Sequence, residues 1–125
     1  MLNTPPVFSV FVSMLNLRNL IANGGVQEME KRNIAKAKLL YDEIDSNPSF
    51  KGAVEVEDRS NMNITFLLTD ESRAADFDQM WKAAGIVGLP GHRSVGGYRA
   101  SIYNALPIDS VQVLVNTMKE FSQNK

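Results

Sequence analysis

Cysteine is absent from this chain of 125 residues, and histidine occurs once, as His92. The lack of cysteine excludes disulfides, thiolate nucleophiles and zinc–thiolate sites. It also fits a reducing compartment, and we expect a cytoplasmic protein. One histidine is too few for most metal centres, so no metal site is expected. The glycine signatures of nucleotide binding, GxGxxG and the P-loop, are missing as well.

An excess of charge is also lacking, because thirteen Lys and Arg stand against fourteen Asp and Glu, for a net charge of −1. We therefore expect neither nucleic acid nor a membrane surface as a partner. The longest apolar-rich stretch, residues 7–21, is interrupted by polar side chains and falls short of the roughly 20 apolar residues that a bilayer requires. No basic region precedes it, which is not the pattern of a signal peptide.

Apolar residues make up 44% of the chain and charged residues 22%, the balance of one globular domain. Pro5 and Pro6 suit the first turn of a helix, and Asn3 or Thr4 is expected to cap it. This helix, within residues 1–25, is apolar on nearly all sides and needs to be covered on all sides. We interpret it as a contact helix between domains or subunits, and residues 26–125 as the domain proper.

A second helix is predicted over residues 26–44, after the Asn-Gly-Gly sequence at 23–25 ends the first. Its apolar stripe and its charged face separate at helical spacing. The stripe is Ala37, Leu40, Tyr41 and Ile44. The face expected in solvent is Glu28, Glu30, Lys31, Arg32, Lys36 and Lys38.

The rest of the chain alternates short strands and helices. Strands are predicted at residues 53–56, 63–68, 86–87 and 98–103. Asp70 begins a third helix with Phe77, Met80, Trp81 and Ala84 on its apolar side, and Pro107 begins a last helix. The last helix buries Val111, Leu114, Val115 and Met118. This order predicts an α+β fold, a small and mainly antiparallel sheet covered on one face by helices.

Residues 88–104 are the unusual window, because four glycines and Pro90 surround the single histidine. His92 and Arg93 fall on a glycine-bordered loop, whereas Arg99 projects from a strand. Arginine offers a planar fork of donors to a carboxylate or phosphate, and histidine can add another donor. Two cationic centres six residues apart suit a substrate with two anionic ends. A flexible turn with surface arginines explains the same pattern, and spacing alone leaves both interpretations open.

No catalytic constellation is complete. Acidic residues lie on helix faces that are expected to be exposed to solvent, or in turns such as 57–59. Nothing in the sequence indicates that they are buried, as a carboxyl group with a shifted catalytic pKa would be. Trp81 and the methionines fall at helical spacing and are expected in the core. Composition and spacing by themselves support only an anion-binding α+β domain.

Four stretches nevertheless resemble the phosphoserine aminotransferase family. They are NTPP at residues 3–6, MEKRN at 29–33, DRSNMN at 58–63 and GIVGLPGHRSVGGYRASIYNA at 85–105. The last stretch is the most specific. The resemblance covers essentially the whole chain and corresponds to the C-terminal third of that family's enzymes.

The resemblance implies a homodimeric, pyridoxal-phosphate-dependent transaminase of fold type I that exchanges an amino group between phosphoserine and 2-oxoglutarate, in serine and vitamin B6 synthesis. Arg99 would hold the α-carboxylate of the substrate. His92 and Arg93 would hold its phosphate, or the distal carboxylate of glutamate. Asn3 and Thr4 would reach the cofactor phosphate of the partner subunit.

The family's Schiff-base lysine has no counterpart here, because it would fall upstream of Asn3. Five lysines, Lys31, Lys36, Lys38, Lys51 and Lys82, lie in helix-face or turn contexts instead. Covalent attachment of the cofactor then has no agent. We therefore expect a small C-terminal domain without catalytic residues of its own, inactive alone and lacking its large domain. The alternative is a stand-alone anion-binding or dimerisation module.

Overall fold

The computed structural model describes residues 3–124. The chain forms two compact units, residues 1–31 and 32–125, and each is described by itself. The boundary between the two units falls within a helix, and the domain limits expected from the sequence stay a prediction. Among the described residues, no helix is both long and apolar enough to cross a membrane.

The first unit contains α1, Val7–Ala22, which buries none of its side chains. The expectation that Asn3 or Thr4 caps this helix is wrong. The cap residue is Pro6, and the structure shows no side-chain cap bond at this position. The 7–22 helix itself is confirmed, and it ends at Asn23, before Gly24 and Gly25 with φ of 96° and 75°. Positive φ is the conformation that glycine adopts without steric cost, so the sequence at 23–25 ends the helix as predicted.

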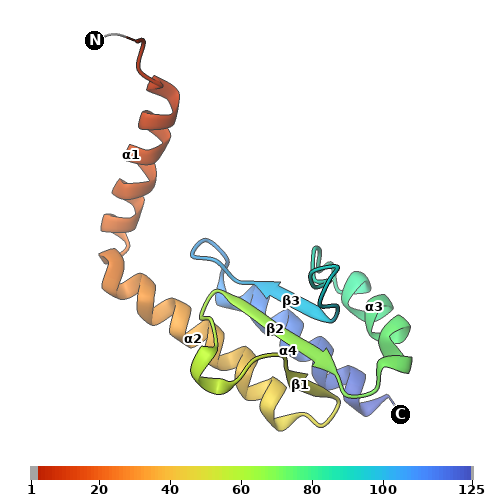
Figure 1. Ribbon diagram of the computed structural model, residues 1–125. Helices are drawn as coiled ribbons and strands as arrows, with labels where there is room; N and C mark the ends of the chain where they lie inside the picture. The colour runs from red at the N-terminus through yellow and green to blue at the C-terminus, as the bar shows by residue number, and fades with distance from the viewer. Residues whose placement is uncertain (1–2, 125) are drawn as a thin grey trace. The chain divides into compact units, whose positions relative to one another are not determined.

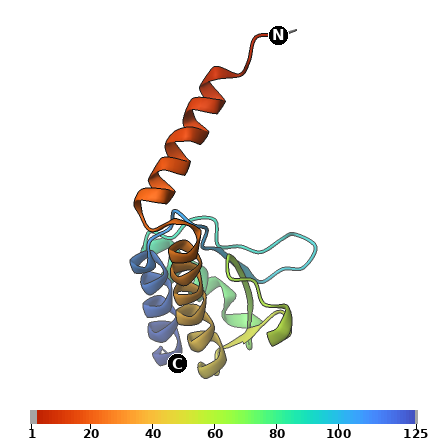
Figure 2. The same ribbon diagram turned by 90° about the vertical axis from the view of Figure 1, so that its left-hand side faces the viewer.

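The second unit is a three-stranded antiparallel sheet with helices, which confirms the α+β class. Strand order is β1-β2-β3. The strands are β1 Phe50–Gly52, β2 Asn63–Leu68 and β3 Tyr98–Ser101; the helices are α2 Gly25–Ser46, α3 Ala74–Ala83 and α4 Ile108–Gln123, with 3-10 turns at Val56–Asp58 and Glu71–Arg73. Figures 1 and 2 show α4 and the later turns of α2 side by side on one face of the sheet. Within the described residues of this unit, no helix covers the other face.

Two predicted strands are wrong. Residues 53–56 do not form one, because Phe50 rather than Val54 or Val56 enters the core, and β1 therefore ends at Gly52. Residues 86–87 do not form one either. Pairing with β3 occurs slightly later, as a single bridge between Pro90 and Tyr98. Proline has no N–H to continue a ladder, so the bridge stays isolated.

The remaining elements follow the sequence pattern. β2 has the predicted bounds, 63–68, and β3 begins at Tyr98 as expected but ends at Ser101. The predicted stripes of α2 and α4 are buried, and so is Trp81. Asp70 caps the short turn before α3, and its carboxylate accepts from the backbone N–H of Ser72. Ala84 is the exception to its stripe, since it is exposed.

Phe77 of α3 is the centre of the core. Its ring is fully buried and lies 5.0–6.4 Å from four other aromatic rings, one on each strand and one on α4. These rings belong to Phe50, Phe66, Tyr98 and Phe121. Edge-to-face pairs at these separations add to the gain from burial. One side chain thus joins the sheet to two helices.

Asp78, the next residue, ties α3 to the start of β3. Its carboxylate accepts from the phenol of Tyr98 and from the indole of Trp81, each at 3.0 Å. Burial, followed by the bond to Asp78, raises the pKa of Tyr98 well above its ordinary value. The phenol therefore stays protonated and donating across the physiological range, which fixes the inner face of β3.

We predict that Phe77→Ala destabilises the fold by about 3–5 kcal/mol, because it removes a buried ring and leaves a cavity among four others. Urea unfolding followed by circular dichroism measures the loss. Val87→Ala is the matched control, since Val87 is 88% exposed and should change the free energy of unfolding by less than about 0.5 kcal/mol. Equal losses for the two variants would contradict a core centred on Phe77.

Candidate functional site

Arg99 projects from the helix-free face of the sheet, as the alternation of β3 predicts. Tyr98 and Ala100 are buried, whereas Arg99 and Ser101 are exposed. Arg99 is the cross-strand partner of Thr65 on β2, and the Thr65 side chain also lies on the face away from the helices. The guanidinium is thus carried by a strand whose opposite face is locked into the core.

A polar cluster stands beside Arg99 on the same face. Ser101 donates to the amide oxygen of Asn63 at 3.0 Å, and the phenol of Tyr103 lies 3.2 Å from the Asn63 amide nitrogen. The bonds to Asn63 and Ser101, with a smaller contribution from the Arg99 charge, lower the pKa of the Tyr103 phenol. The face around Arg99 therefore carries several hydrogen-bonding side chains beside one positive charge.

His92 and Arg93 lie at the tip of a loop that two backbone bonds close. Gly91 N–H donates to Gly97 C=O at 2.8 Å, and Arg99 N–H donates to Leu89 C=O at 2.7 Å. Both His92 and Arg93 are exposed. The loop therefore has a fixed base next to Arg99 and a tip that carries two donors.

Glycine is required at the two ends of this loop. A Cβ at Gly91 would lie 2.2 Å from the carbonyl oxygen of Gly96. At Gly97, where φ is +64°, it would lie 2.3 Å from Leu67 Cδ2 and 2.8 Å from the Phe66 carbonyl oxygen. No side chain fits at either distance. Glycine at 97 therefore lets the loop lie directly on β2, and glycine at 91 lets the two ends of the loop approach each other.

The imidazole of His92 is oriented by Ser94. Its Nδ1 accepts from the Ser94 backbone N–H at 3.3 Å and lies 2.7 Å from Ser94 Oγ. An accepting Nδ1 places the proton of the neutral ring on Nε2. His92 can therefore donate one hydrogen bond from Nε2 to an anion without gaining charge.

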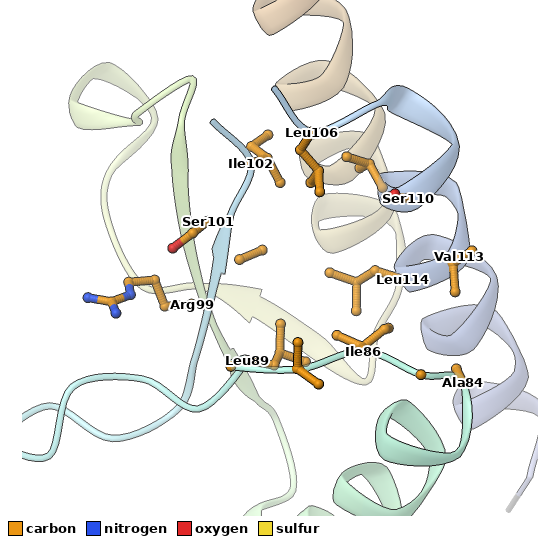
Figure 3. A pocket seen from close by; sticks show the side chains of 15 residues that line it. Ala84, Ile86, Leu89, Arg99, Ser101, Ile102, Leu106, Ser110, Val113 and Leu114 are labelled. Atoms are coloured by element: carbon orange, nitrogen blue, oxygen red, sulfur yellow. The ribbon is translucent and has the colours of Figure 1, made fainter. Parts of the chain in front are cut away.

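A cavity of about 400 Å³ opens beside β3, between α4 and residues 84–89. Its walls are mainly apolar, with Ile102, Leu106 and Leu114 facing inward, as Figure 3 shows. Arg99 borders it, but the guanidinium points to the other side of the strand (Figure 3). His92 and Arg93 do not line this cavity. The structure does not bring the three predicted cationic residues into one cavity, and the two-ended grip stays a prediction.

Lys36 is the largest departure from the sequence expectation, which placed it in solvent. Its side chain is only 2% exposed, and Nζ donates to the carbonyl oxygens of Ile102 at 3.0 Å, Tyr103 at 2.7 Å and Leu106 at 3.1 Å. Helical periodicity held a signal, because Lys36 adjoins the buried Ala37 and precedes Leu40 by one turn. A lysine at such a position is predicted to be exposed unless the carbonyl groups that accept its hydrogen bonds are known.

Asn3 and Thr4 lie before α1 and are exposed. Because neither caps the helix, their amide and hydroxyl groups are not used by its first turn. These neutral donors are the type that accompanies a phosphate near a helix start. Their assignment to a cofactor phosphate stays a prediction.

The sequence model of the family described as aminotransferase class-V matches residues 1–114. The chain belongs to the class-V aminotransferase family. Phosphoserine aminotransferases are similar to it: that of Flavobacterium johnsoniae is 66% identical over 119 residues, which are 95% of this chain and 33% of the relative. That of Flavobacterium psychrophilum is 62% identical over 125 residues, all of this chain and 35% of the relative.

Solved structures agree with these sequences. The phosphoserine aminotransferase of Bacillus circulans subsp. alkalophilus has a TM-score of 0.90 at 43% identity, over 97% of this chain and 34% of that one. The pyridoxal-phosphate-bound enzyme of Trichomonas vaginalis has a TM-score of 0.84 at 38% identity, over 95% of this chain and 34% of that one. The chain thus spans about a third of the length of the relatives it matches.

We predict that Gly97→Ala destabilises the loop more than Gly96→Ala. Both residues have positive φ, which costs an alanine about 1–2 kcal/mol. Only at Gly97 does the new methyl group also collide with β2, whereas nothing lies within 4 Å at Gly96. Urea unfolding compares the two losses, and amide chemical shifts of residues 66–67 should move only in Gly97→Ala. Equal effects would show that the loop does not lie on β2 in solution.

Proposed function

We propose that this chain is the small domain of a pyridoxal-phosphate-dependent phosphoserine transaminase, and that it supplies groups that bind the anionic ends of the substrate. The observation that carries the proposal is an exposed arginine on a core-locked strand, immediately after a glycine-fixed loop that bears a histidine and a second arginine. The class-V family match and the names of the relatives support the reaction type. The amino-group acceptor would be 2-oxoglutarate, within serine and vitamin B6 synthesis.

Arg99 would bind the carboxylate that all amino-acid substrates share. A guanidinium offers two parallel N–H groups that match a carboxylate, and such charge-assisted pairs are roughly twice as strong as neutral ones. Its place on β3 supports this role, because a strand whose inner face is buried holds the side chain's base still. The rigid strand β3 is therefore a suitable support for a side chain that binds the carboxylate shared by all these substrates.

His92 and Arg93 would bind the group that differs between substrates, the phosphate of phosphoserine or the distal carboxylate of glutamate. Nε2–H of His92 and the Arg93 guanidinium are donors on an exposed loop tip. A loop tip can adjust to a tetrahedral or a planar anion more readily than a strand. The proposal therefore divides recognition between a fixed and an adaptable support.

The contact proposed between this chain and the cofactor is with the cofactor's phosphate. Asn3 and Thr4 would donate to that phosphate in the partner subunit of a homodimer. The described lysines do not suit covalent attachment, since Lys36 is saturated by three carbonyl groups and Lys31, Lys38, Lys51, Lys82 and Lys119 are exposed. Pyridoxal phosphate supplies the electron sink for amino transfer when it is bound. The attaching lysine would come from a large domain.

We predict different losses for two variants of the complete protein that contains this chain. Arg99→Ala should lower kcat/KM for every amino-acid substrate by about tenfold to hundredfold, since bonds to charged groups contribute about 1.5–3 kcal/mol. Arg93→Ala should impair phosphoserine more than glutamate, because phosphate carries more charge. Steady-state kinetics with both substrates measures the ratios. Equal losses with Arg93→Ala would remove the phosphate assignment.

We predict that the 125-residue chain alone forms no stoichiometric adduct with pyridoxal phosphate. Borohydride treatment followed by peptide mass spectrometry should find only scattered labelling of exposed lysines, and transaminase activity should be absent. Stoichiometric labelling of a single lysine would contradict the proposal. Micromolar binding of phosphoserine by the isolated chain, measured by calorimetry, would instead favour an autonomous anion-binding module, since half of an anion site should bind weakly.

A further inference from the structure

The turn between β3 and α4, residues 102–106, directs three carbonyl groups toward α2, in contacts that are buried or partly buried. One ammonium group satisfies them all, that of Lys36 on α2, with N···O distances of 2.7–3.1 Å. Lysine has three N–H donors and no acceptor, so donors and acceptors match in number. The side chain is 2% exposed, and the contact is therefore shielded from competing water.

A second bond from the same helix holds this turn. Asn33, almost one turn before Lys36, is 5% exposed and donates from its amide nitrogen to the Asn104 side-chain oxygen at 2.7 Å. Leu106 N–H also donates to Tyr103 C=O at 2.9 Å, which closes the turn internally. Residues 102–106 are thus clamped to α2 at several points.

The clamp acts directly on the end of β3. Ile102, whose carbonyl group contacts Lys36, also donates its N–H to Met62 C=O at 2.9 Å, one rung beyond the assigned strand. Tyr103, whose carbonyl group also contacts Lys36, places its phenol against Asn63 on the helix-free face. The backbone of this residue is held from the helix side, and its side chain stands beside Arg99.

We propose that Lys36 is a positioning residue for the Arg99 anion site, because it fixes the turn that sets the end of β3 and the place of the Tyr103 phenol. This inference rests on the proposed role of Arg99, but its structural half can be tested separately. Without the ammonium group, three buried carbonyl groups lose their partner. The turn must then reorganise so that these carbonyl groups reach water. The hydrogen bond from Ile102 N–H to Met62 C=O at the end of β3 is expected to be lost as well.

The first test uses the 125-residue chain with Lys36→Met, which keeps the length of the side chain but removes the donors. NMR titration of tyrosine Cζ follows the Tyr103 phenol, assigned by Tyr103→Phe. Its pKa is lowered by Asn63 and Ser101 and by the Arg99 charge. We expect it to rise toward the ordinary value in Lys36→Met. An unchanged Tyr103 titration in a folded Lys36→Met variant would overturn the proposal.

Lys38→Met is the matched control, two residues away on the same helix. Its side chain is 70% exposed and pairs with Asp42 on that helix. We expect no change in the Tyr103 titration. A general loss of stability cannot produce the difference between the two variants, because both titrations are read under conditions where circular dichroism shows a folded chain.

A second measurement needs no variant and applies even if Lys36→Met does not fold. In the wild-type chain, a ¹⁵N spectrum of lysine side chains should show one Nζ group whose protons exchange at least tenfold more slowly than those of Lys38. Burial and three carbonyl acceptors protect that group. Exchange of all Nζ groups at the rate of Lys38 would mean that the clamp does not form in solution.

Kinetics of the complete protein separate this inference from the proposed function. Lys36→Met should raise KM for amino-acid substrates about tenfold with a smaller change in kcat, since the end of β3 and the Tyr103 phenol shift while Arg99 itself is kept. If Arg99→Ala weakens substrate use and Lys36→Met does not, the inference fails and the proposed function stands. If Arg99→Ala has no effect, the proposed function fails, and the Tyr103 titration still decides whether Lys36 positions the turn.

Discussion

The contact on which the site depends is the packing of Phe77 against one aromatic ring from each strand. Because the ring of Tyr98 lies 5.0 Å from Phe77 and its phenol donates to Asp78, the inner face of β3 cannot rotate. Side chains alternate along a strand, so fixing Tyr98 inward fixes Arg99 outward. A displaced Phe77 would therefore alter the direction of the guanidinium as well as the stability of the core. The proposed chemistry of Arg99 is a consequence of apolar packing on the opposite face.

Much of this could be read from the sequence, because burial leaves a periodic trace. The stripes of α2 and α4, the bounds of β2 and the outward direction of Arg99 all follow from spacing and alternation. Residues 53–56 and 86–87 could not be placed in this way. A run of two to four apolar residues does not reveal whether a strand partner is available, and Pro90 prevents a longer ladder after the second of them. The prediction that Lys36 lies in solvent was wrong for another reason, since no periodicity in the sequence shows where unsatisfied carbonyl groups will lie.

The candidate site divides in the same manner. His92, Arg93 and Arg99 could be chosen as candidates from the residue types at 91–105 and from the resemblance to one family. Their spacing in the sequence could not predict whether the three side chains lie close together. They lie on supports of different stiffness, a core-locked strand and a loop tip whose base is closed by Gly91 and Gly97. Glycine at 97 is explained by the approach of the loop to β2, and glycine at 91 by the approach of the two ends of the loop to each other. The base of the loop is therefore fixed, while the tip that carries His92 and Arg93 is exposed.

The choice of lysine at position 36 follows from the number of acceptors. An apolar side chain of similar length would fill the space, but it would leave the carbonyl groups of Ile102, Tyr103 and Leu106 without donors. A neutral amine has only two N–H groups, so three contacts at 2.7–3.1 Å fit the ammonium form. Burial opposes that charge and lowers the pKa of Lys36. Lys36 has no carboxylate partner among the described residues, so this arrangement gives little net stability, and we infer that its contribution is to favour one conformation of the turn. Specificity for that conformation, which sets the end of β3 beside Arg99, is the physical reason to bury a cation there.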